Sequence, residues 1–253
     1  MRRFKANESL ASQLYEAIKN EIITCALEPG QQIAQPKLAE KYQVGITPIR
    51  EALQRLTQEG LIQPIARFGY VVTPISLSDV TAMYELRSVL EAAAARLAAL
   101  RGPQEQLDRI AELADTKYAF TDRESYSSFL THNREFHRSV AAASSNPKLA
   151  DFLSKLFDEM TRVFHLRPEP VDDSEQMRAE HKALAGALCK RDPDEAERIV
   201  LEQIASSQKR VLATLISIAG VGTNALGQMV HLGLSSPDGL WSEKVSDAAR
   251  LAD

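Results

Sequence analysis

Beyond residue 76 the chain consists of helix-forming stretches separated by breaks that carry proline or a capping residue, and this pattern constrains the fold most. The first stretch is Ala-rich and runs from Ser76 to about Arg101, where Gly102-Pro103 stops it. Ser76 with Asp79 three residues later resembles a capping box. Further helices are expected at 104–119, 122–145, 148–166, 174–190 and 193–217. Six antiparallel helices of this length form a bundle.

The first 73 residues predict a smaller unit of three helices and a β-hairpin. Apolar residues recur every fourth position from Leu10 to Ile22, which is typical of an amphipathic helix. A short second helix is expected from Pro36, and a third helix is expected to start with Thr47 as its N-cap and to end at Gly60. Two β-like runs, 61–65 and 70–73, then flank a glycine-containing turn.

These patterns divide the chain into four parts. Residues 1–73 form the helix-and-hairpin domain, residues 74–77 a proline-containing linker, and residues 78–217 the helical domain. Residues 218–253 carry several glycines and no long apolar stripe, so we treat them as a tail of unknown order, with one candidate short helix near 239–251. The fold class expected is therefore mostly α.

Composition excludes several classes of protein. The chain is 44% hydrophobic and 25% charged, as ordinary globular proteins are. Its two cysteines cannot build a disulfide framework or a CxxC zinc cluster, which favours a reducing compartment. The basic N-terminus lacks the apolar core of a signal peptide. The run 211–221 is shorter than the ~18 apolar residues of a spanning helix. We expect a cytoplasmic protein without a membrane partner.

The distribution of charge agrees with two different partners for the two halves. The net charge is −4, but residues 1–75 hold 9 Lys and Arg against 7 Asp and Glu. The acidic excess therefore lies in the helical half. A slightly basic front domain is compatible with nucleic acid, although the asymmetry is mild.

The start of the third helix carries side chains suited to a DNA groove. Arg50 can bind guanine through two hydrogen bonds or hold a phosphate, and the nearby Thr and Gln side chains can bond to bases or backbone. Taken alone, exposed arginines here would also fit a solvated helix face. A helix of this kind after a turn is built to enter the major groove, with the hairpin tip reaching adjacent phosphates or the minor groove. The expected DNA contacts are Thr47, Arg50, Gln54, Arg55, Arg67 and Gly69.

These residues resemble those of a known family. The matching stretches are Leu38-Ala39-Glu40, Val44-Gly45-Ile46-Thr47-Pro48-Ile49-Arg50-Glu51-Ala52-Leu53-Gln54-Arg55-Leu56, Glu59-Gly60-Leu61-Ile62 and Gly69-Tyr70-Val71-Val72. They are similar to the winged helix of GntR-type transcription regulators. The resemblance implies that Thr47, Arg50 and Glu51 carry the family's roles, with Glu51 making an internal bond. Gly45 and Ile46 depart from the family's usual Ser or Thr and Arg, at two positions that usually contact DNA in the family.

Polar residues on apolar stripes indicate a site inside the bundle. Asn133 and His137 lie four apart among apolar residues, and His181 and Gln203 have similar surroundings. Arg87 could be another pocket residue or could simply pair with Glu91 on the surface. Buried polar groups need partners, so four converging ones would form a site. A lone histidine on such a face is more often a satisfied core residue.

The helical half resembles the effector domain of the FadR-type (FCD) branch. The matching marks are Glu85-Leu86-Arg87, Asn133-x-x-Phe136-His137, Asn146-Pro147-x-Leu149, Glu180-His181 and Asp192-x-x-Glu195-Ala196. Many members bind a divalent metal through Asp or Asn and three His. Here those positions hold Asn133, His137, His181 and Gln203, and two neutral amides are poorer ligands for zinc or nickel. The resemblance leaves two options open: a metal site (Zn, Ni or Mn) at Asn133, His137 and His181, or a metal-free pocket.

In the metal-free option, Arg87, His137 and His181 hold an anionic effector, because a guanidinium binds a carboxylate through two bonds. The interpretation is a ligand-responsive transcription regulator, most simply a repressor released by a small organic acid. The resemblance implies a homodimer on a pseudo-palindromic DNA duplex. The alternatives are a metal-dependent enzyme using His137 and His181, and an adaptor that does not bind DNA.

Overall fold

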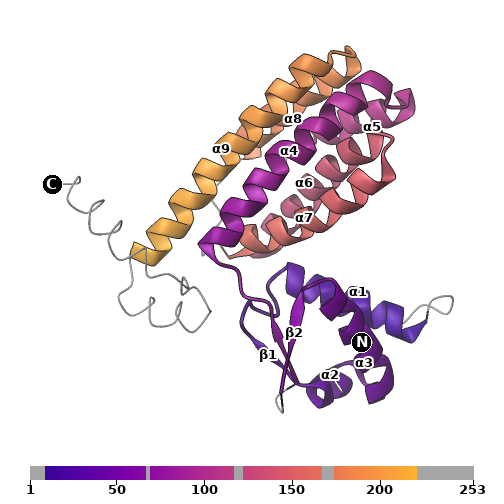
Figure 1. The fold of residues 1–253 in the computed structure, drawn as a ribbon, viewed down its shortest axis with the longest axis vertical. Helices are drawn as coiled ribbons and strands as arrows, with labels where there is room; N and C mark the ends of the chain where they lie inside the picture. Colours follow the sequence, from indigo (N-terminus) through magenta and orange to yellow (C-terminus); the bar gives the residue numbers. More distant parts are fainter. Residues whose placement is uncertain (1–8, 67–68, 117–121, 167–173, 221–253) are drawn as a thin grey trace.

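The computed structural model describes residues 9–66, 69–116, 122–166 and 174–220, which form two parts joined by a short linker (Figure 1). A small N-terminal domain of helices and strands lies against one end of an elongated helical bundle. Each part has its own hydrophobic core. No helix in this portion of the chain is long and apolar enough to cross a membrane.

The N-terminal domain contains three helices and a small three-stranded sheet. Its elements are α1 (Leu10–Ile23), β1 (Gln32–Ile33), α2 (Gln35–Tyr42), α3 (Ile46–Gln58), β2 (Ile62–Ile65) and β3 (Gly69–Val72). The strand order is β1-β3-β2, and both pairings are antiparallel. Strand β1 has only two residues, too few to give a periodic signal in the sequence, and we did not expect it.

The first residues of α3 differ from the expectation. The helix begins at Ile46 with Gly45 as its N-cap, so Thr47 lies inside the first turn and the predicted Thr47 cap is wrong. The reason is local: Gln43 adopts a left-handed conformation (φ 55°) and ends α2, which leaves the chain free to start the next helix two residues early. At the other end of α3, Gly60 (φ 76°) follows the C-cap residue Glu59, as predicted.

The bundle comprises six helices in the described residues. They are α4 (Leu77–Arg101), α5 (Gln104–Ala114), α6 (Arg123–Ala143), α7 (Pro147–His165), α8 (Ser174–Cys189) and α9 (Pro193–Gly220). The predicted capping box of Ser76 and Asp79 is present at the start of α4. Helix α5 is shorter than expected, because the chain turns at Asp115, whose carboxylate binds Arg178 and Lys182 of α8.

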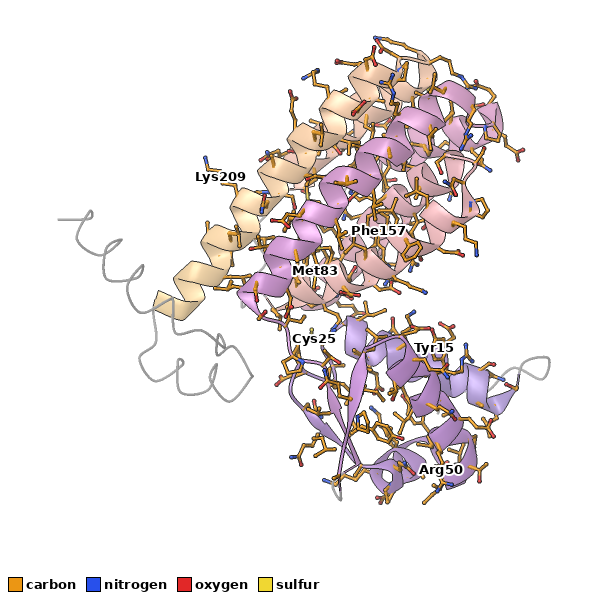
Figure 2. The ribbon with its side chains drawn as sticks, in the orientation of Figure 1. Tyr15, Cys25, Arg50, Met83, Phe157 and Lys209 are labelled. Carbon is orange, nitrogen blue, oxygen red and sulfur yellow. The ribbon has the colours of Figure 1, made fainter. Side chains whose placement is uncertain are left out.

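The two domains meet where α1 packs against α7. Figure 2 shows Arg50 at the end of the molecule farthest from the bundle, with Phe157 inside the bundle. Helix α9 continues three residues beyond the predicted boundary at 217. The part of the predicted tail from 221 onward, with the candidate helix near 239–251, lies outside the described residues.

Candidate nucleic-acid interface and effector site

Helix α3 is buried on one face and exposed on the other. Its inner side chains Ile49, Ala52, Leu53 and Leu56 are completely buried in the core of the N-terminal domain. On the outer face, Thr47, Arg50 and Gln54 are exposed, and their side chains make no hydrogen bond or ion pair with other described residues. A rigid helix with free donors on its outer face can read the major groove.

The N-terminus of α3 also favours an anionic partner. Its N-cap, Gly45, offers no side chain to the first amides of the helix, and its first turn contains no acidic residue. Helix dipoles place partial positive charge at this end, where phosphate oxygens bind readily. This end and Arg50 lie on the same exposed helix, so DNA phosphates and bases can meet them together.

Three other predicted DNA contacts have different settings. The guanidinium of Arg55 lies 3.8 Å from the centre of the Tyr15 ring and 3.3 Å from Ser12 Oγ, so α1 already engages it. Arg67 lies outside the described residues. Gly69 has a φ of 95°, and a Cβ there would approach Ile33 O to 2.6 Å. A glycine is therefore required at position 69 because β1 packs so closely against it, and this holds with or without a contact to DNA.

The centre of the bundle contains a buried ion pair. Arg87 and Glu91, both 5% exposed, are joined by a 2.5 Å hydrogen bond from Arg87 Nε to Glu91 Oε1. The second carboxylate oxygen lies 3.1 Å from Nδ1 of His137 on α6. The four-residue spacing allowed a surface pair as one of two options for Arg87, whereas the structure buries the pair. Glu91 thus occupies the position between Arg87 and His137 that an anionic effector was expected to occupy.

Burial and charge together set the protonation states of this cluster. Burial alone would raise the pKa of Glu91, but the charges of Arg87 and His137 hold it at about 2. Burial, aided by His137 and His132, holds the pKa of His181 well below its usual 6.5. His181 is therefore neutral at neutral pH, and Glu91 is ionised.

The remaining predicted pocket residues form one layer with this pair. Arg101 at the end of α4 donates to Ser144 O beyond the end of α6, so the two helices run parallel and Arg87 lies level with Asn133. The His181 ring lies 5.3 Å from that of His137, and Gln203 Nε2 donates to Glu180 O. The contacts therefore join Arg87, His137 and His181, through Glu91 and the two rings, whereas Asn133 and Gln203 are placed near them only through neighbouring residues on α6 and α8.

Two polar atoms in this layer have no partner. Arg87 Nη1 and Asn133 Oδ1 are buried and make no hydrogen bond within the described residues. Buried groups of this kind are rare, because an unmade hydrogen bond costs about 1–3 kcal/mol. One is a donor and the other an acceptor, so a ligand carrying both complementary groups would satisfy them.

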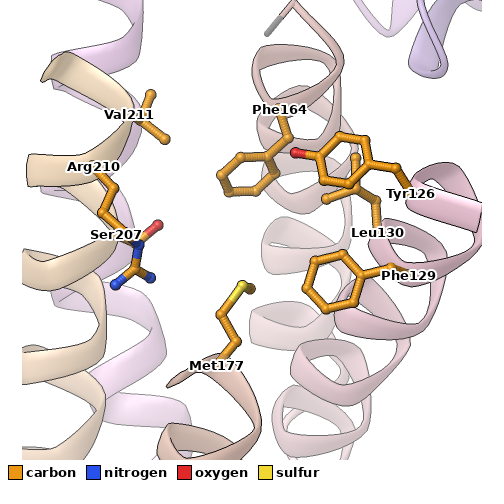
Figure 3. A pocket seen from close by; sticks show the side chains of 8 residues that line it. All are labelled: Tyr126, Phe129, Leu130, Phe164, Met177, Ser207, Arg210 and Val211. Atoms are coloured by element: carbon orange, nitrogen blue, oxygen red, sulfur yellow. The ribbon is translucent and has the colours of Figure 1, made fainter. Parts of the chain in front are cut away.

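A small cavity lies about one helical turn from the polar layer, toward the N-terminus of α6, and Figure 3 shows the side chains that line it. Phe129, Met177 and Ser207 each stand four residues from a member of that layer on α6, α8 and α9. Figure 3 shows Tyr126 and Phe164 on the opposite side from Ser207. The cavity volume is about 10 Å³, the space of a single water molecule. A larger ligand needs these side chains to move, and the flexible Met177 can do so.

The residues present do not fit a tight transition-metal site. The described part of the chain has no group of three or more His, Cys, Asp and Glu side chains able to hold a metal. Two imidazoles remain at the position, with Asn133 and Gln203 as amides, and the Gln203 amide already donates to Glu180 O. Zinc and nickel bind imidazole, thiolate and carboxylate more tightly than neutral amides. We therefore assign no chemistry to a metal here.

Comparison with known proteins agrees with this architecture. Residues 10–72 match the family described as bacterial regulatory proteins, gntR family, and residues 82–206 match the FCD domain. The HTH-type transcriptional repressor RspR of Escherichia coli is 25% identical over 79% of this chain and 89% of its own. The probable D-xylose utilization operon transcriptional repressor of Paenarthrobacter nicotinovorans is 27% identical over 78% of this chain and 87% of its own. The solved structure of E. coli McbR/YncC has the same fold, with a TM-score of 0.69, 22% identity and coverage of 81% and 98%.

Proposed function

This chain belongs to the GntR family of bacterial transcription regulators, in the branch with an FCD domain, and we propose that it is a repressor whose DNA affinity is controlled by a small organic acid. The observation that carries the DNA assignment is the outer face of α3, where Thr47, Arg50 and Gln54 are exposed and unengaged on a helix with a fully buried opposite face. The matching proteins are transcription regulators, not enzymes. Because its partner would be chromosomal DNA, we place the protein in the cytoplasm.

Selection from a random duplex library, followed by a salt titration of the selected duplex, tests this proposal. We expect log Kd to rise linearly with log salt, with a slope of about 0.9 per phosphate neutralised. We also expect inverted repeats with half-sites about one helical turn apart, since a two-fold dimer reads two equivalent sites. Failure to enrich any duplex at low salt would contradict DNA binding.

The exposed face of α4 supports the dimer. Apolar residues recur along it at Ala82, Leu86, Val89, Ala93 and Leu100, and all five are exposed. The first four are spaced by four, three and four residues, and the half-buried Leu97 continues the pattern to Leu100, which is the spacing of a coiled-coil seam. Leu86 also lines an open groove of about 570 Å³ between the two domains, together with the exposed Phe152 of α7. We propose that a second copy of the chain covers this α4 seam.

Substituting Val89 with glutamate is expected to weaken the dimer and, with it, binding to a two-site duplex. Val89 is 68% exposed in the single chain, so the variant should fold normally. In a dimer, two carboxylates would enter an apolar seam. Sedimentation equilibrium measures the mass directly, with Glu85→Gln on the same helix as the control. A Val89→Glu protein that remains dimeric at wild-type concentration would exclude this seam.

The effector proposal follows from the orphaned atoms of the polar layer. A carboxylate or carbonyl oxygen on the ligand would accept from Arg87 Nη1, and a hydroxyl or protonated group would donate to Asn133 Oδ1. Because Glu91 already balances the charge of Arg87, the site favours a ligand with few charges over a polyanion. Its apolar part would enter the cavity at Phe129 and Met177. We propose that this site operates without a metal.

A further inference from the structure

A buried aspartate lies at the boundary between the two domains. Asp158 of α7 is 3% exposed and is surrounded by three cationic side chains. Its Oδ1 accepts from Arg138 at 2.7 Å and from Arg134 at 3.1 Å, and its Oδ2 lies 3.1 Å from Lys19 Nζ. The two arginines belong to α6 of the bundle, whereas Lys19 belongs to α1 of the DNA-binding domain.

On the DNA-binding side, the contacts continue to α3. Lys19 Nζ lies 2.8 Å from Glu59 Oε2, and Glu59 is the C-cap residue of α3. Tyr15 of α1 donates to Glu59, and the guanidinium of Arg55 on α3 covers the Tyr15 ring. Burial alone would lower the pKa of Lys19, but Glu59, Tyr15 and Asp158 raise it, so the ammonium stays charged.

On the bundle side, the contacts begin beside the effector site. Arg134 directly follows Asn133 in sequence, and Arg138 directly follows His137. Asn133 and His137 face the polar layer, whereas the two arginines face α7. A ligand that moves α6 at the polar layer therefore also moves both arginines relative to Asp158. Helix movements of about 1–2 Å are typical of such transitions.

We infer that Asp158 and Lys19 are positioning residues that couple the effector site on α6 to the DNA-reading helix α3. In this arrangement α6 holds Asp158 through two arginines, and Asp158 holds α1 and Glu59 through Lys19. Movement of α6 changes the angle at which α3 is presented to DNA, although neither residue contacts DNA or ligand. The inference rests on the proposed effector response and concerns how that response reaches α3.

Linkage supplies a test that needs no identified effector. If a ligand at α6 changes DNA affinity, then DNA changes the free energy of the α6 states by the same amount. Hydrogen exchange of the full-length protein would be measured with and without the duplex selected by the wild type. In the wild type we expect DNA to change amide exchange in residues 131–140 of α6 more than in α5 (Gln104–Ala114), the internal reference.

The variants Lys19→Gln and Asp158→Asn should bind the duplex but lose the exchange change in α6. Lys19→Gln is the more conservative of the two, because it leaves Asp158 paired with both arginines. It keeps the test decisive where Asp158→Asn folds poorly. Arg96→Gln, which removes an exposed contact between α4 and α9, is the matched control and should respond as the wild type does.

Each result separates the inference from the proposed function. Loss of the α6 response in Lys19→Gln, with the response intact in Arg96→Gln, supports the coupling. A wild-type protein that binds the duplex without any α6 response, or a Lys19→Gln protein with a full response, overturns it and leaves DNA binding intact. A wild-type protein that binds no duplex overturns the proposed function itself.

Discussion

Replacing Arg50 with alanine is expected to lower affinity for the selected duplex by about 1–3 kcal/mol per site, or roughly 5- to 150-fold, with the melting temperature unchanged. The physical reason is that Arg50 is exposed and unengaged within the described residues, so its removal leaves the fold intact. Only the contact with DNA is lost. Fluorescence anisotropy gives the affinity, and thermal unfolding gives the stability.

Arg55 on the same helix provides the matched comparison. Its guanidinium packs on Tyr15 and bonds to Ser12, so Arg55→Ala removes a contact inside the protein. We expect Arg55→Ala to lower the melting temperature and to weaken DNA binding less than Arg50→Ala does. Equal losses of affinity in the two variants would show that exposure on α3 does not identify the DNA-reading side chains. Unchanged binding by Arg50→Ala would remove α3 from the interface.

Local signals explain why most of the fold could be predicted. Prolines, capping residues and apolar periodicity act within a few residues, so the helices of the bundle and the capping box at Ser76 were found from sequence. The start of α3 was missed because Thr47 is an intrinsically good cap, whereas the position of the preceding turn at Gln43 decided where the helix began. Strand β1 depends on pairing with β3, which is distant in the sequence.

In the candidate sites too, features set by local spacing could be predicted, whereas features that depend on contacts between distant residues could not. Helix spacing was sufficient to place Asn133 and His137 on one face of α6, and the structure sets the His181 ring beside that of His137. The burial of Glu91 could not be predicted from the sequence. An Arg and a Glu four residues apart on a helix are usually an exposed pair, and only the packing of the other helices decides that this pair is buried. Asp158 was also missed, since its three cations come from α1 and α6 and meet only in the folded chain.

The buried pair of Arg87 and Glu91 has the largest expected effect on stability. Substituting Glu91 with glutamine at neutral pH should lower the free energy of unfolding by about 3–5 kcal/mol, because Arg87 then remains buried without a counter-charge. Arg87→Ala should have a comparable cost for the complementary reason. An Arg87→Ala protein would therefore lose stability as well as effector binding, so it cannot test the pocket by itself.

Lowering the pH is expected to remove the stability that the Arg87–Glu91 pair contributes. The pKa of Glu91 is about 2 in the folded protein and lies below the ordinary value of 4.5. A carboxyl group with a lowered pKa stabilises the fold above its unfolded pKa, and this contribution disappears as the pH falls from about 4.5 toward 2. The wild type should lose stability across that range, and Glu91→Gln should lose less. Chemical denaturation at several pH values measures the free energy of unfolding of both proteins. If both lost the same stability between about pH 4.5 and 2, Glu91 would not be the group that titrates.

The double variant Arg87→Met/Glu91→Gln separates stability from effector binding. It removes both members of the Arg87–Glu91 pair, so neither is left buried without the other, and the cost should be smaller than that of either single variant. The melting temperature is then measured with a panel of aliphatic, hydroxylated and aromatic carboxylates, and separately with zinc, nickel and manganese. A compound that binds the folded protein raises it. We expect certain carboxylates to raise the melting temperature of the wild type and none to raise that of the double variant. A carboxylate that stabilises both proteins equally would exclude Arg87 from the site, and stabilisation by a metal alone would contradict the metal-free proposal.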